Sequence, residues 1–302
     1  MLYQINKLWK KTVVYAMTAA IGVVISMCSA MTVHAEEPKE QKTQVAAPQY
    51  EIYVNRAANC VTVYQLTEDG TQAIPVRSFA CSTGRFEGST PLGVFQTSDY
   101  YDWRLMVDGT YGQYAVRFNG SILFHSVPYY SQSPDQLEWD QFNLLGQNAS
   151  LGCVRLATSD VKWIYDNCPK RTKVVVYDDA TNPGPLGKPI QMTVPENHPF
   201  KDWDPTDPNP QNPWNLIKPT MKLTKDMGDG VLYLKEGSTM EDVKAAISVI
   251  GIDGRQYMPA EYEIYINGNY DLNTFGVYRV WVKSLDISGM MIEQEMIMAV
   301  VK

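Results

Sequence analysis

Prolines are concentrated in one segment of this chain. Ten of its 18 prolines lie between residues 181 and 219. Proline fixes φ and has no backbone N–H, so a segment this rich in proline cannot continue a helix or run through the interior of a sheet. We therefore expect residues 181–219 to form an extended, semi-rigid linker between two folded regions.

Short β-forming runs dominate the region before this linker. Turn residues separate these runs, which include residues 52–54, 61–64, 74–81 and 173–177. One helix is expected over residues 160–167, with Thr158 or Ser159 as its cap and Pro169 after its end. The pattern predicts a mainly β domain with one packed helix over residues 50–180.

The region after the linker, residues 220–302, has a second β-rich pattern. Strands are expected over residues 262–266, 277–282 and 295–301. Ser238 and Glu241 have the spacing of a capping box for a short helix. The strand content fits a small β-sandwich, and the GVYRVWV strand followed by a turn resembles bacterial immunoglobulin-like surface modules.

The first 35 residues have the pattern of a secretory signal peptide. Lys7, Lys10 and Lys11 precede a long apolar run, and Val33 and Ala35 are small residues at the expected cleavage site. Residues 36–49 are then a flexible lead. We expect a secreted protein, extracellular or associated with the cell wall. The alternative is an uncleaved membrane anchor, because the apolar run approaches the length of one span.

Charge and motif content exclude several classes of function. The net charge is −7 and becomes −10 once the three lysines of the signal are removed, so no electrostatic footprint for nucleic acid remains. No CxxC pair, HExxH motif or EF-hand loop occurs. No metal site and no cofactor are therefore predicted.

The heptapeptide SLGCVRL at 150–156 contains a candidate nucleophile, Cys153. A thiol reacts as the thiolate and needs a neighbouring base. Of the three histidines, His34 lies in the signal and His198 in the linker. That leaves His125, which follows the apolar run 122–124. The alternative is that Cys153 is a small buried hydrophobe and His125 a structural histidine.

The residues beside Cys153 favour acyl transfer chemistry. Gly152 has no side chain, so the backbone there can turn its amides toward a bound carbonyl. The N–H groups of Leu151, Gly152 and Cys153 could then form an oxyanion hole. Arg155 lies two residues further on, on the same side of a strand as the thiol. It could stabilise the thiolate or bind a substrate carboxylate.

Three further cysteines follow the signal: Cys60, Cys81 and Cys168. Export permits disulfides, but a nucleophile must stay free, so one of these three would remain unpaired. Cys81 with Cys168 and Cys60 with Cys81 are the pairings to test first.

Six motifs occur in a fixed order along the chain. They are TPLG at 90–93, YGQYAVRF at 111–118, FHS at 124–126, SLGCVRL at 150–156, DVKWIYDNC at 160–168 and PGPLGKP at 183–189. Together they resemble the catalytic domain of L,D-transpeptidases of the YkuD type, in the form common in Gram-positive bacteria. The resemblance implies a YkuD-type mixed β-sandwich catalytic domain with a packed helix, followed by the small immunoglobulin-like β-sandwich.

This resemblance implies a role for each catalytic residue. Cys153 would be the nucleophile, and His125 would accept and later donate the proton. The backbone carbonyl of Ser126 would orient the His125 ring, and Gly152 would contribute to the oxyanion hole. The gap of 28 residues between His125 and Cys153 suggests a loop over the cleft, at about residues 129–147, that could act as a lid.

The same resemblance implies substrate contacts from Ser150, Leu151, Arg155 and Tyr111. Arg155 stands where the family uses arginine or asparagine. Leu151 stands where many members carry histidine, a departure expected to alter substrate contacts rather than catalysis.

The implied reaction joins two peptidoglycan stem peptides in the cell wall. Cys153 would attack the carbonyl of the third-position diamino acid of a tetrapeptide, release D-alanine and form a thioester. A side-chain amine of a second stem would take the acyl group, and carbapenems would acylate the same thiol. The alternatives are an L,D-carboxypeptidase, with water as acceptor, and a non-catalytic wall-binding surface protein. The sequence predicts no oligomeric state.

Overall fold

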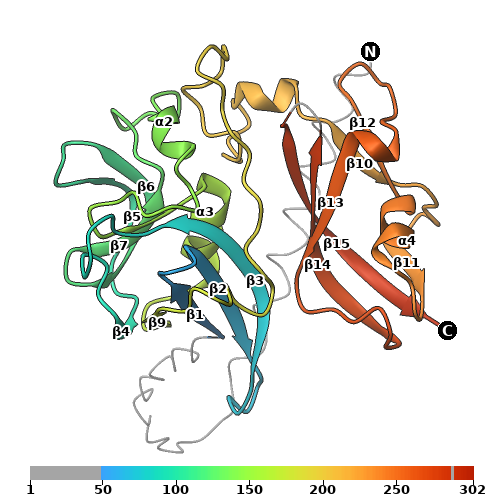
Figure 1. Ribbon diagram of the computed structural model, residues 1–302, viewed down its shortest axis with the longest axis horizontal. Helices are drawn as coiled ribbons and strands as arrows, with labels where there is room; N and C mark the ends of the chain where they lie inside the picture. Colours follow the sequence, from blue (N-terminus) through green and yellow to red (C-terminus); the bar gives the residue numbers. More distant parts are fainter. Residues whose placement is uncertain (1–48, 287–288) are drawn as a thin grey trace, which may run out of the picture. The chain divides into compact units, whose positions relative to one another are not determined.

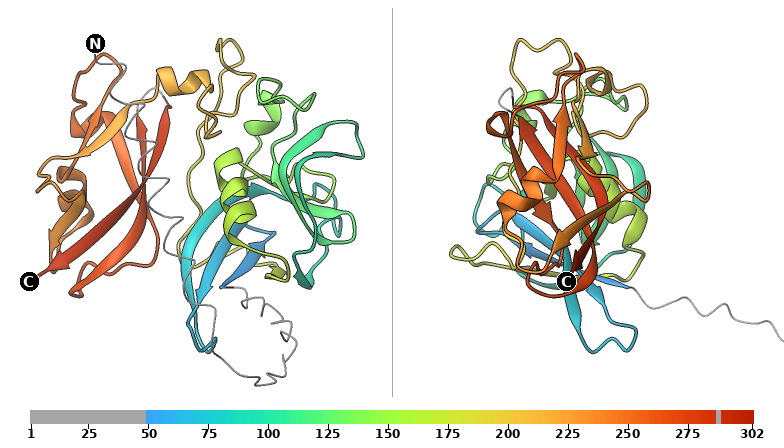
Figure 2. Two further views of the ribbon diagram at one scale, coloured as in Figure 1. Left: turned by 180° about the vertical axis from the view of Figure 1, so that it is seen from behind. Right: turned by 90° about the vertical axis from the view of Figure 1, so that its right-hand side faces the viewer.

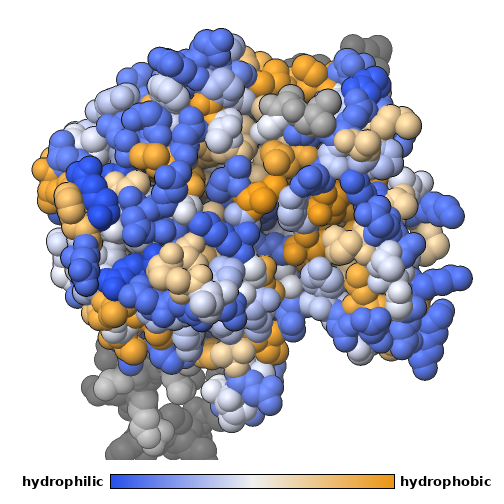
Figure 3. Space-filling model, in the orientation of Figure 1, coloured by the Kyte–Doolittle hydropathy of each residue, from blue (hydrophilic) through white to orange (hydrophobic). Residues whose placement is uncertain are grey.

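The computed structural model describes residues 49–286 and 289–302 (Figure 1). The predicted signal peptide and nearly all of the predicted lead lie outside the described residues. In the described part, no helix is long and apolar enough to cross a membrane. The described residues form a mainly β fold, as the sequence predicted, and apolar patches are interspersed with polar residues on the face drawn in Figure 3.

The largest sheet has nine strands, in the order β4-β9-β1-β2-β3-β8-β7-β6-β5. The strands are β1 Tyr50–Asn55, β2 Cys60–Leu66, β3 Ala73–Ser82, β4 Gly93–Gln96, β5 Tyr100–Leu105, β6 Tyr111–Asn119, β7 Ile122–Ser126, β8 Val154–Leu156 and β9 Lys173–Tyr177. Neighbours are antiparallel except for the pairs β1–β9 and β7–β8. A parallel pair needs a long connection, and residues 127–153, with the short helix α2 (Trp139–Phe142), supply it between β7 and β8.

The nine-stranded sheet curls around one apolar core. Side chains from both halves of the sheet meet Val161 and Ile164 of helix α3 (Thr158–Asn167) in this core. Figure 2 shows α3 lying across the strands when the structure is viewed from behind. Burial of each large apolar side chain contributes roughly 1.5–3 kcal/mol, so this shared core holds β7 and β8 in place.

The start of α3 is capped from a distant part of the chain. The helix begins at Thr158, and Ala157 at its N-cap position makes no side-chain cap. The Thr158 amide instead donates to the Asp204 carboxylate (2.8 Å) and the Ser159 amide to the Thr206 hydroxyl (3.1 Å). The predicted local cap is therefore wrong, and a carboxylate from the proline-rich segment takes its place.

The proline-rich segment packs against the nine-stranded sheet region. Met192, Val194 and Trp214 are buried in one cluster with Val127 and Tyr129. Trp214, in the 3-10 helix η1 (Pro213–Leu216), donates through its indole N–H to two backbone carbonyls of the same segment. The prediction of an extended spacer is therefore wrong, because apolar side chains between the prolines anchor the segment.

The remaining residues form two smaller sheets. The four-stranded sheet has the order β11-β15-β14-β13 and the other pairs β10 with β12. The elements are β10 Thr220–Leu223, β11 Val231–Lys235, α4 Met240–Ala245, β12 Ile247–Ile250, η2 Pro259–Glu261, β13 Tyr262–Asn267, β14 Gly276–Asp286 and β15 Met291–Val301. The capping box of α4 is formed by Thr239 and Asp242, one residue beyond the predicted pair. The immunoglobulin-like character of this region stays a prediction.

Strand β3 contacts the four-stranded sheet through buried polar groups. Nη2 of Arg77 donates to both carboxylate oxygens of Glu293 (2.9 Å each), and the guanidinium lies 4.4 Å from the ring centre of Trp281. The Asn267 amide accepts from the Ser78 N–H (3.0 Å) and donates to the Ser78 carbonyl (2.7 Å). Both backbone groups of Ser78 are therefore satisfied without a further strand.

Candidate active site

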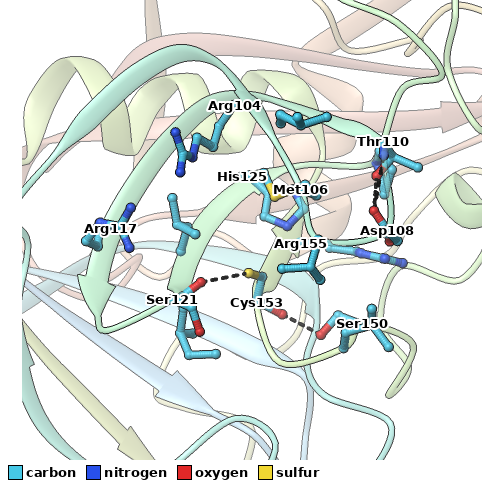
Figure 4. A pocket seen from close by; sticks show the side chains of 16 residues that line it. Arg104, Met106, Asp108, Thr110, Arg117, Ser121, His125, Ser150, Cys153 and Arg155 are labelled. Carbon is cyan, nitrogen blue, oxygen red and sulfur yellow. Dashed lines mark hydrogen bonds between the residues drawn. The ribbon is translucent and has the colours of Figure 1, made fainter.

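A cavity of about 150 Å³ lies where β7, the turn before β8 and the β5–β6 turn meet (Figure 4). Cys153, His125 and Arg155 all line this cavity. Met106 and Asp108 of the β5–β6 turn line it as well. The two residues that the sequence singled out as a nucleophile and its base thus share one cavity.

Parallel pairing of β7 and β8 brings these residues together. The register places His125 opposite Arg155, and residues two apart on a strand face the same side. Cys153, two residues before Arg155, therefore faces the cavity with both. The Cys153 thiol contacts the Ser121 carbonyl, with Sγ and oxygen 3.8 Å apart. Among the contacts of the described residues, no hydrogen bond joins Sγ to His125.

Gly152 gives the turn before Cys153 its shape. Its φ is +148°, a conformation that favours glycine. A Cβ at this position would lie 2.6 Å from the Ser89 carbonyl oxygen and 2.9 Å from Ile122 Cδ1. Any side chain at residue 152 would therefore displace the backbone that presents the thiol.

Two buried hydroxyls hold this turn. The Ser150 hydroxyl donates to the Cys153 carbonyl (2.6 Å) and accepts from the Gly152 N–H (3.0 Å). The Thr90 hydroxyl donates to the Gly152 carbonyl (2.7 Å) and accepts from the Gly84 N–H (2.8 Å). The backbone on both sides of the thiol is therefore fixed before any ligand arrives.

These contacts revise two of the roles expected for this turn. The Gly152 N–H is already bonded to Ser150, so it is not free to stabilise an oxyanion. Ser150 lines the cavity but is 1% exposed, and its hydroxyl is committed within the turn. Ser150 thus acts as a positioning residue rather than a substrate ligand.

His125 is a neutral base held in one orientation. Its Nδ1 lies 2.6 Å from the Ser126 carbonyl oxygen. A carbonyl only accepts, so Nδ1 carries the proton and Nε2 keeps its lone pair. Burial, with the nearby Arg155 guanidinium, lowers the pKa of His125 to about 3. A Cβ on Gly112 would lie 2.7 Å from Nδ1, so the ring packs directly against that glycine.

Cys153 is a neutral thiol in this environment. Burial raises the pKa of the Cys153 thiol, while the backbone of Leu123 and the charge of Arg155 act in the opposite direction. A raised cysteine pKa and a lowered histidine pKa both disfavour a thiolate–imidazolium pair. The resting site is therefore a thiol beside a neutral imidazole.

Arg155 is a buried cation that forms no salt bridge within the part of the chain that the structure describes. It is 7% exposed, and its Nη1 donates to the side-chain oxygen of Gln141 (2.8 Å). Its Nε is buried and has no hydrogen-bond partner. Burial lowers the pKa of Arg155, and the charges of Asp108 and Glu138 partly offset this.

The other expected contacts divide into two groups. Leu151 is 42% exposed and lines the cavity, in keeping with a substrate contact. Tyr111 is not among the cavity-lining residues, and its ring packs on the cluster that contains Tyr129. The loop over residues 129–147 also differs from the expected lid, because Leu137 and Phe142 are fully buried there. The turn that lines the cavity instead connects β5 and β6.

Three residues of the site are not predicted by the sequence. The sequence places Thr90 only in a turn, because its hydroxyl contact to Gly152, 62 positions away, leaves no local signal. Gly112 did offer a signal, because glycine inside a strand marks a close approach. Asp108 lies in the β5–β6 turn, where an aspartate ordinarily indicates only a turn.

The four cysteines of the described residues are free thiols. Cys60 pairs in register with Ala80, so Cys81 points to the opposite face of the sheet. A Cys60–Cys81 disulfide would therefore need the backbone to move. Cys81 and Cys168 both lie in the main core as separate thiols. In the described part, no cluster of His, Cys, Asp and Glu is placed to hold a metal ion.

Residues 49–176 match the model of the YkuD family, described as the L,D-transpeptidase catalytic domain. A relative in Bacillus subtilis (strain 168), YciB, is provisionally named an L,D-transpeptidase. It is 34% identical over 95 residues, which are 30% of this chain and 47% of YciB. The match thus spans about half the length of that relative.

Solved structures of L,D-transpeptidases are also similar to this chain. One from Mycobacterium tuberculosis H37Rv is 23% identical over 43% of this chain and 58% of its own, with a TM-score of 0.34. One from Stackebrandtia nassauensis is 22% identical over 48% of this chain and 64% of its own, with a TM-score of 0.33. The match to the YkuD family model, the L,D-transpeptidase catalytic domain, thus covers β1 to β8, β9 up to Val176 and all the residues that line the cavity.

Proposed function

We propose that this protein cross-links peptidoglycan stem peptides, with Cys153 as the nucleophile and His125 as its base. One observation carries the proposal. The two side chains face one cavity from adjacent parallel strands, inside the residues that match the L,D-transpeptidase family. The family match supports the peptidoglycan substrate, and the geometry supports the roles of Cys153 and His125.

Acylation begins from the neutral pair. Nε2 of His125 takes the thiol proton while Sγ of Cys153 attacks the carbonyl of the third residue of a tetrapeptide. The C–N bond to the terminal D-alanine then breaks, and the imidazolium returns its proton to the leaving amine. The product is a thioester on Cys153. The Ser126 carbonyl keeps His125 in the tautomer with the proton on Nδ1, which these proton transfers require.

The developing oxyanion needs backbone donors. Because the Gly152 N–H is bonded to Ser150, we assign this role to the amides of Leu151 and Cys153. One donor in such a site contributes roughly 2.7–4 kcal/mol of transition-state stabilisation. The fixed turn supplies this stabilisation without reorganisation during the reaction.

The second half-reaction transfers the acyl group to an amine. The side-chain amine of another stem attacks the thioester, a C–N bond forms and the C–S bond breaks. The amine proton passes through His125 to Sγ, which restores the thiol. Water in place of the amine gives the L,D-carboxypeptidase reaction. Both reactions require the protein outside the membrane, consistent with the proposed signal peptide at residues 1–35.

The experiment compares residues 36–302 with a Cys153→Ala variant and a Cys60→Ala control that removes a buried thiol. Each protein is incubated with disaccharide tetrapeptides, and the products are resolved by mass spectrometry. Dimers from the unmodified protein and the control, but not from Cys153→Ala, are the expected result. Dimers from all three proteins, or from none, would overturn the assignment, whereas monomers shortened by one alanine would identify the hydrolase.

A carbapenem gives a second readout of the same thiol. Incubation of the intact protein with the drug should add one drug mass to the unmodified protein and to Cys60→Ala. The Cys153→Ala variant should stay at its own mass. An adduct on that variant would show that another residue is the nucleophile.

A further inference from the structure

Tyr114 lies in the middle of β6 with a left-handed backbone. Its φ is +51°, a region that regular strands do not use and that is unfavourable for any residue with a side chain. The register of β6 with β7 runs from Asn119 as far as Val116 and resumes at Tyr111, opposite Tyr129. A strained residue persists only where its surroundings hold it, and such residues cluster at functional sites.

The side chains of β6 change faces around Tyr114. On one side of it, Val116 lies in the main core and Arg117 lines the cavity, as alternation along a strand requires. Unbroken alternation would put Gly112 on the core face with Val116. A Cβ on Gly112 would instead lie 2.7 Å from Nδ1 of His125, which lines the cavity. The strand therefore exchanges its two faces between Gly112 and Val116, with Tyr114 at the midpoint.

The backbone N–H groups of β6 reverse direction in the same place. The Arg117 N–H donates to the Asp99 carbonyl, beside β5 (2.9 Å). Unbroken alternation would point the Gln113 N–H toward the same neighbour. It donates instead to the Ser126 hydroxyl on β7 (2.8 Å). The hydrogen bonds and the side chains thus independently place the reversal of β6 at Tyr114.

This reversal creates the space that holds the His125 ring. It turns Gly112 toward the imidazole, on the face where unbroken alternation would put the Gln113 side chain. The Gln113 N–H takes the Ser126 hydroxyl as its acceptor, while the Ser126 carbonyl oxygen lies 2.6 Å from Nδ1 of His125. The ring therefore has both the room and the acceptor that keep Nε2 available to the thiol.

Helix α3 holds Tyr114 in this conformation. The Tyr114 ring packs edge-on against the Tyr165 ring, with the ring centres 5.6 Å apart. Its centre lies 5.1 Å from Nζ of Lys162. The Tyr165 hydroxyl donates to Asp102 (2.8 Å), the β5 residue at the level of Tyr114. A glycine would lack these ring contacts, so they account for a tyrosine in a backbone conformation that favours glycine.

We propose that Tyr114 is a positioning residue for proton transfer by His125, and that it acts through its left-handed backbone. The ring anchors this conformation on α3, and the conformation sets the orientation of the imidazole. The inference rests on the proposed function and adds a residue to it. It predicts that glycine at position 114 preserves the site better than valine does, although valine is the better residue for a regular strand.

The first measurement examines the His125 ring without any substrate. Residues 36–302 contain two histidines, His125 and His198, so ¹⁵N-labelled histidine gives two ring signals, and His125→Gln identifies them. Two-bond correlations between ring protons and nitrogens show which nitrogen is protonated at neutral pH. The unmodified protein, Tyr114→Gly and Tyr114→Asn should carry the proton on Nδ1 of His125, because glycine and asparagine tolerate a left-handed backbone. Tyr114→Val should show a mixture of both tautomers.

The second measurement is the rate at which a carbapenem acylates Cys153, followed by intact mass. Tyr114→Val should react about a hundredfold more slowly than the unmodified protein, the effect of a misplaced general base. Tyr114→Gly should stay close to the unmodified rate, even though loss of the ring contacts lowers its urea midpoint. If Tyr114→Val does not fold, Tyr114→Ala takes its place, because it differs from Tyr114→Gly by a single Cβ.

Arg171 supplies the matched control. It also has a left-handed backbone (φ +74°), and it lies in an exposed turn that does not line the cavity. Arg171→Val should be less stable than Arg171→Gly, while both keep the His125 signal and the acylation rate of the unmodified protein.

Two results would overturn the inference. One is an unchanged His125 signal and rate in Tyr114→Val. The other is an equal loss in Tyr114→Gly and Tyr114→Val, which would assign the role to the ring instead of the backbone. If the His125 signals follow the expected order but the unmodified protein forms no adduct on Cys153, the proposed function is wrong and the positioning of His125 by Tyr114 stands.

Discussion

His125 on β7 and Arg155 on β8 occupy the same register position of a parallel strand pair. Burial lowers the pKa of the His125 imidazole, and the positive charge of the neighbouring Arg155 lowers it further, so the ring stays neutral. The same neighbour opposes the rise in the pKa of the Cys153 thiol. One arginine thus favours the base form of the histidine and the nucleophilic form of the cysteine.

Neutral burial of His125 makes a contribution to stability that depends on pH. The folded pKa is about 3 and the ordinary value is 6.5. Between these values the unfolded chain binds a proton that the folded protein does not. The contribution is therefore complete above pH 6.5 and falls as pH decreases toward 3, by about 1.4 kcal/mol per pH unit at most.

Urea unfolding of the unmodified protein and of His125→Gln across this pH range tests the expectation. The difference between the two proteins is the quantity to follow. Buried Asp160 and Asp207 have pKa values raised by burial to about 6, and they act in the opposite direction in both proteins. A difference that does not change with pH would contradict neutral burial of His125.

Gly152→Ala should destabilise the protein by more than the cost of placing an alanine at the positive φ of residue 152. Strain at a positive φ costs of order 1–3 kcal/mol, and the contact with the Ser89 carbonyl is added to it. Gly70→Ala is the control, because its φ is +67° and a Cβ there meets no atom within 4 Å. Chemical denaturation of both variants should show the larger loss for Gly152→Ala. Equal losses would mean that the turn relaxes around the added methyl group.

Ser150→Ala should raise the activation free energy of Cys153 acylation by more than it lowers the free energy of unfolding. The change leaves the Gly152 N–H and the Cys153 carbonyl without their shared partner, at a cost of roughly 1–3 kcal/mol. Freed from this contact, the turn would present the thiol in several positions. The rate of carbapenem adduct formation, measured beside a thermal melt, separates the two effects. Ser98→Ala, at an exposed serine that does not line the cavity, should leave both unchanged.

Glu293→Gln should be severely destabilising. It leaves the Arg77 guanidinium, 4% exposed, without its anion, and removal of one partner of a buried pair costs about 3–5 kcal/mol. Glu295→Gln breaks the pair with Arg279, which has exposed side chains, and should cost about 1 kcal/mol or less. Urea denaturation of both variants compares the pairs. Similar small losses would show that water reaches Arg77.

The candidate site could be predicted where the chain offers only one suitable residue for a role. The chain has one histidine in a strand-like segment and one thiol beside glycine and arginine, so Cys153 and His125 followed from residue types. The alternation along a strand also predicted that Arg155 shares a face with Cys153. The neutral state of the pair could not be predicted, because it depends on burial and on the register between β7 and β8.

Predictions failed where a distant residue supplies the contact. The cap of α3 comes from Asp204, 46 positions after Thr158. Tyr111 and Gly112 are neighbours in one motif, yet Gly112 packs against His125 and Tyr111 packs on the cluster that contains Tyr129, because alternate residues of β6 face opposite sides. Proline content correctly excluded regular strands from residues 181–219, but Trp214 and Met192 pack the segment onto the sheet region.

The contacts of β3 and α3 bear on how this protein can be shortened. A chain cut after residue 180 keeps all the residues that match the family but loses Asp204, Trp214 and Glu293. The Thr158 amide in the first turn of α3 would lose its acceptor, Asp204. The buried Arg77 guanidinium would lose the carboxylate of Glu293. The stretch of chain that matches the family is thus shorter than the stretch that supplies the contacts of α3 and β3.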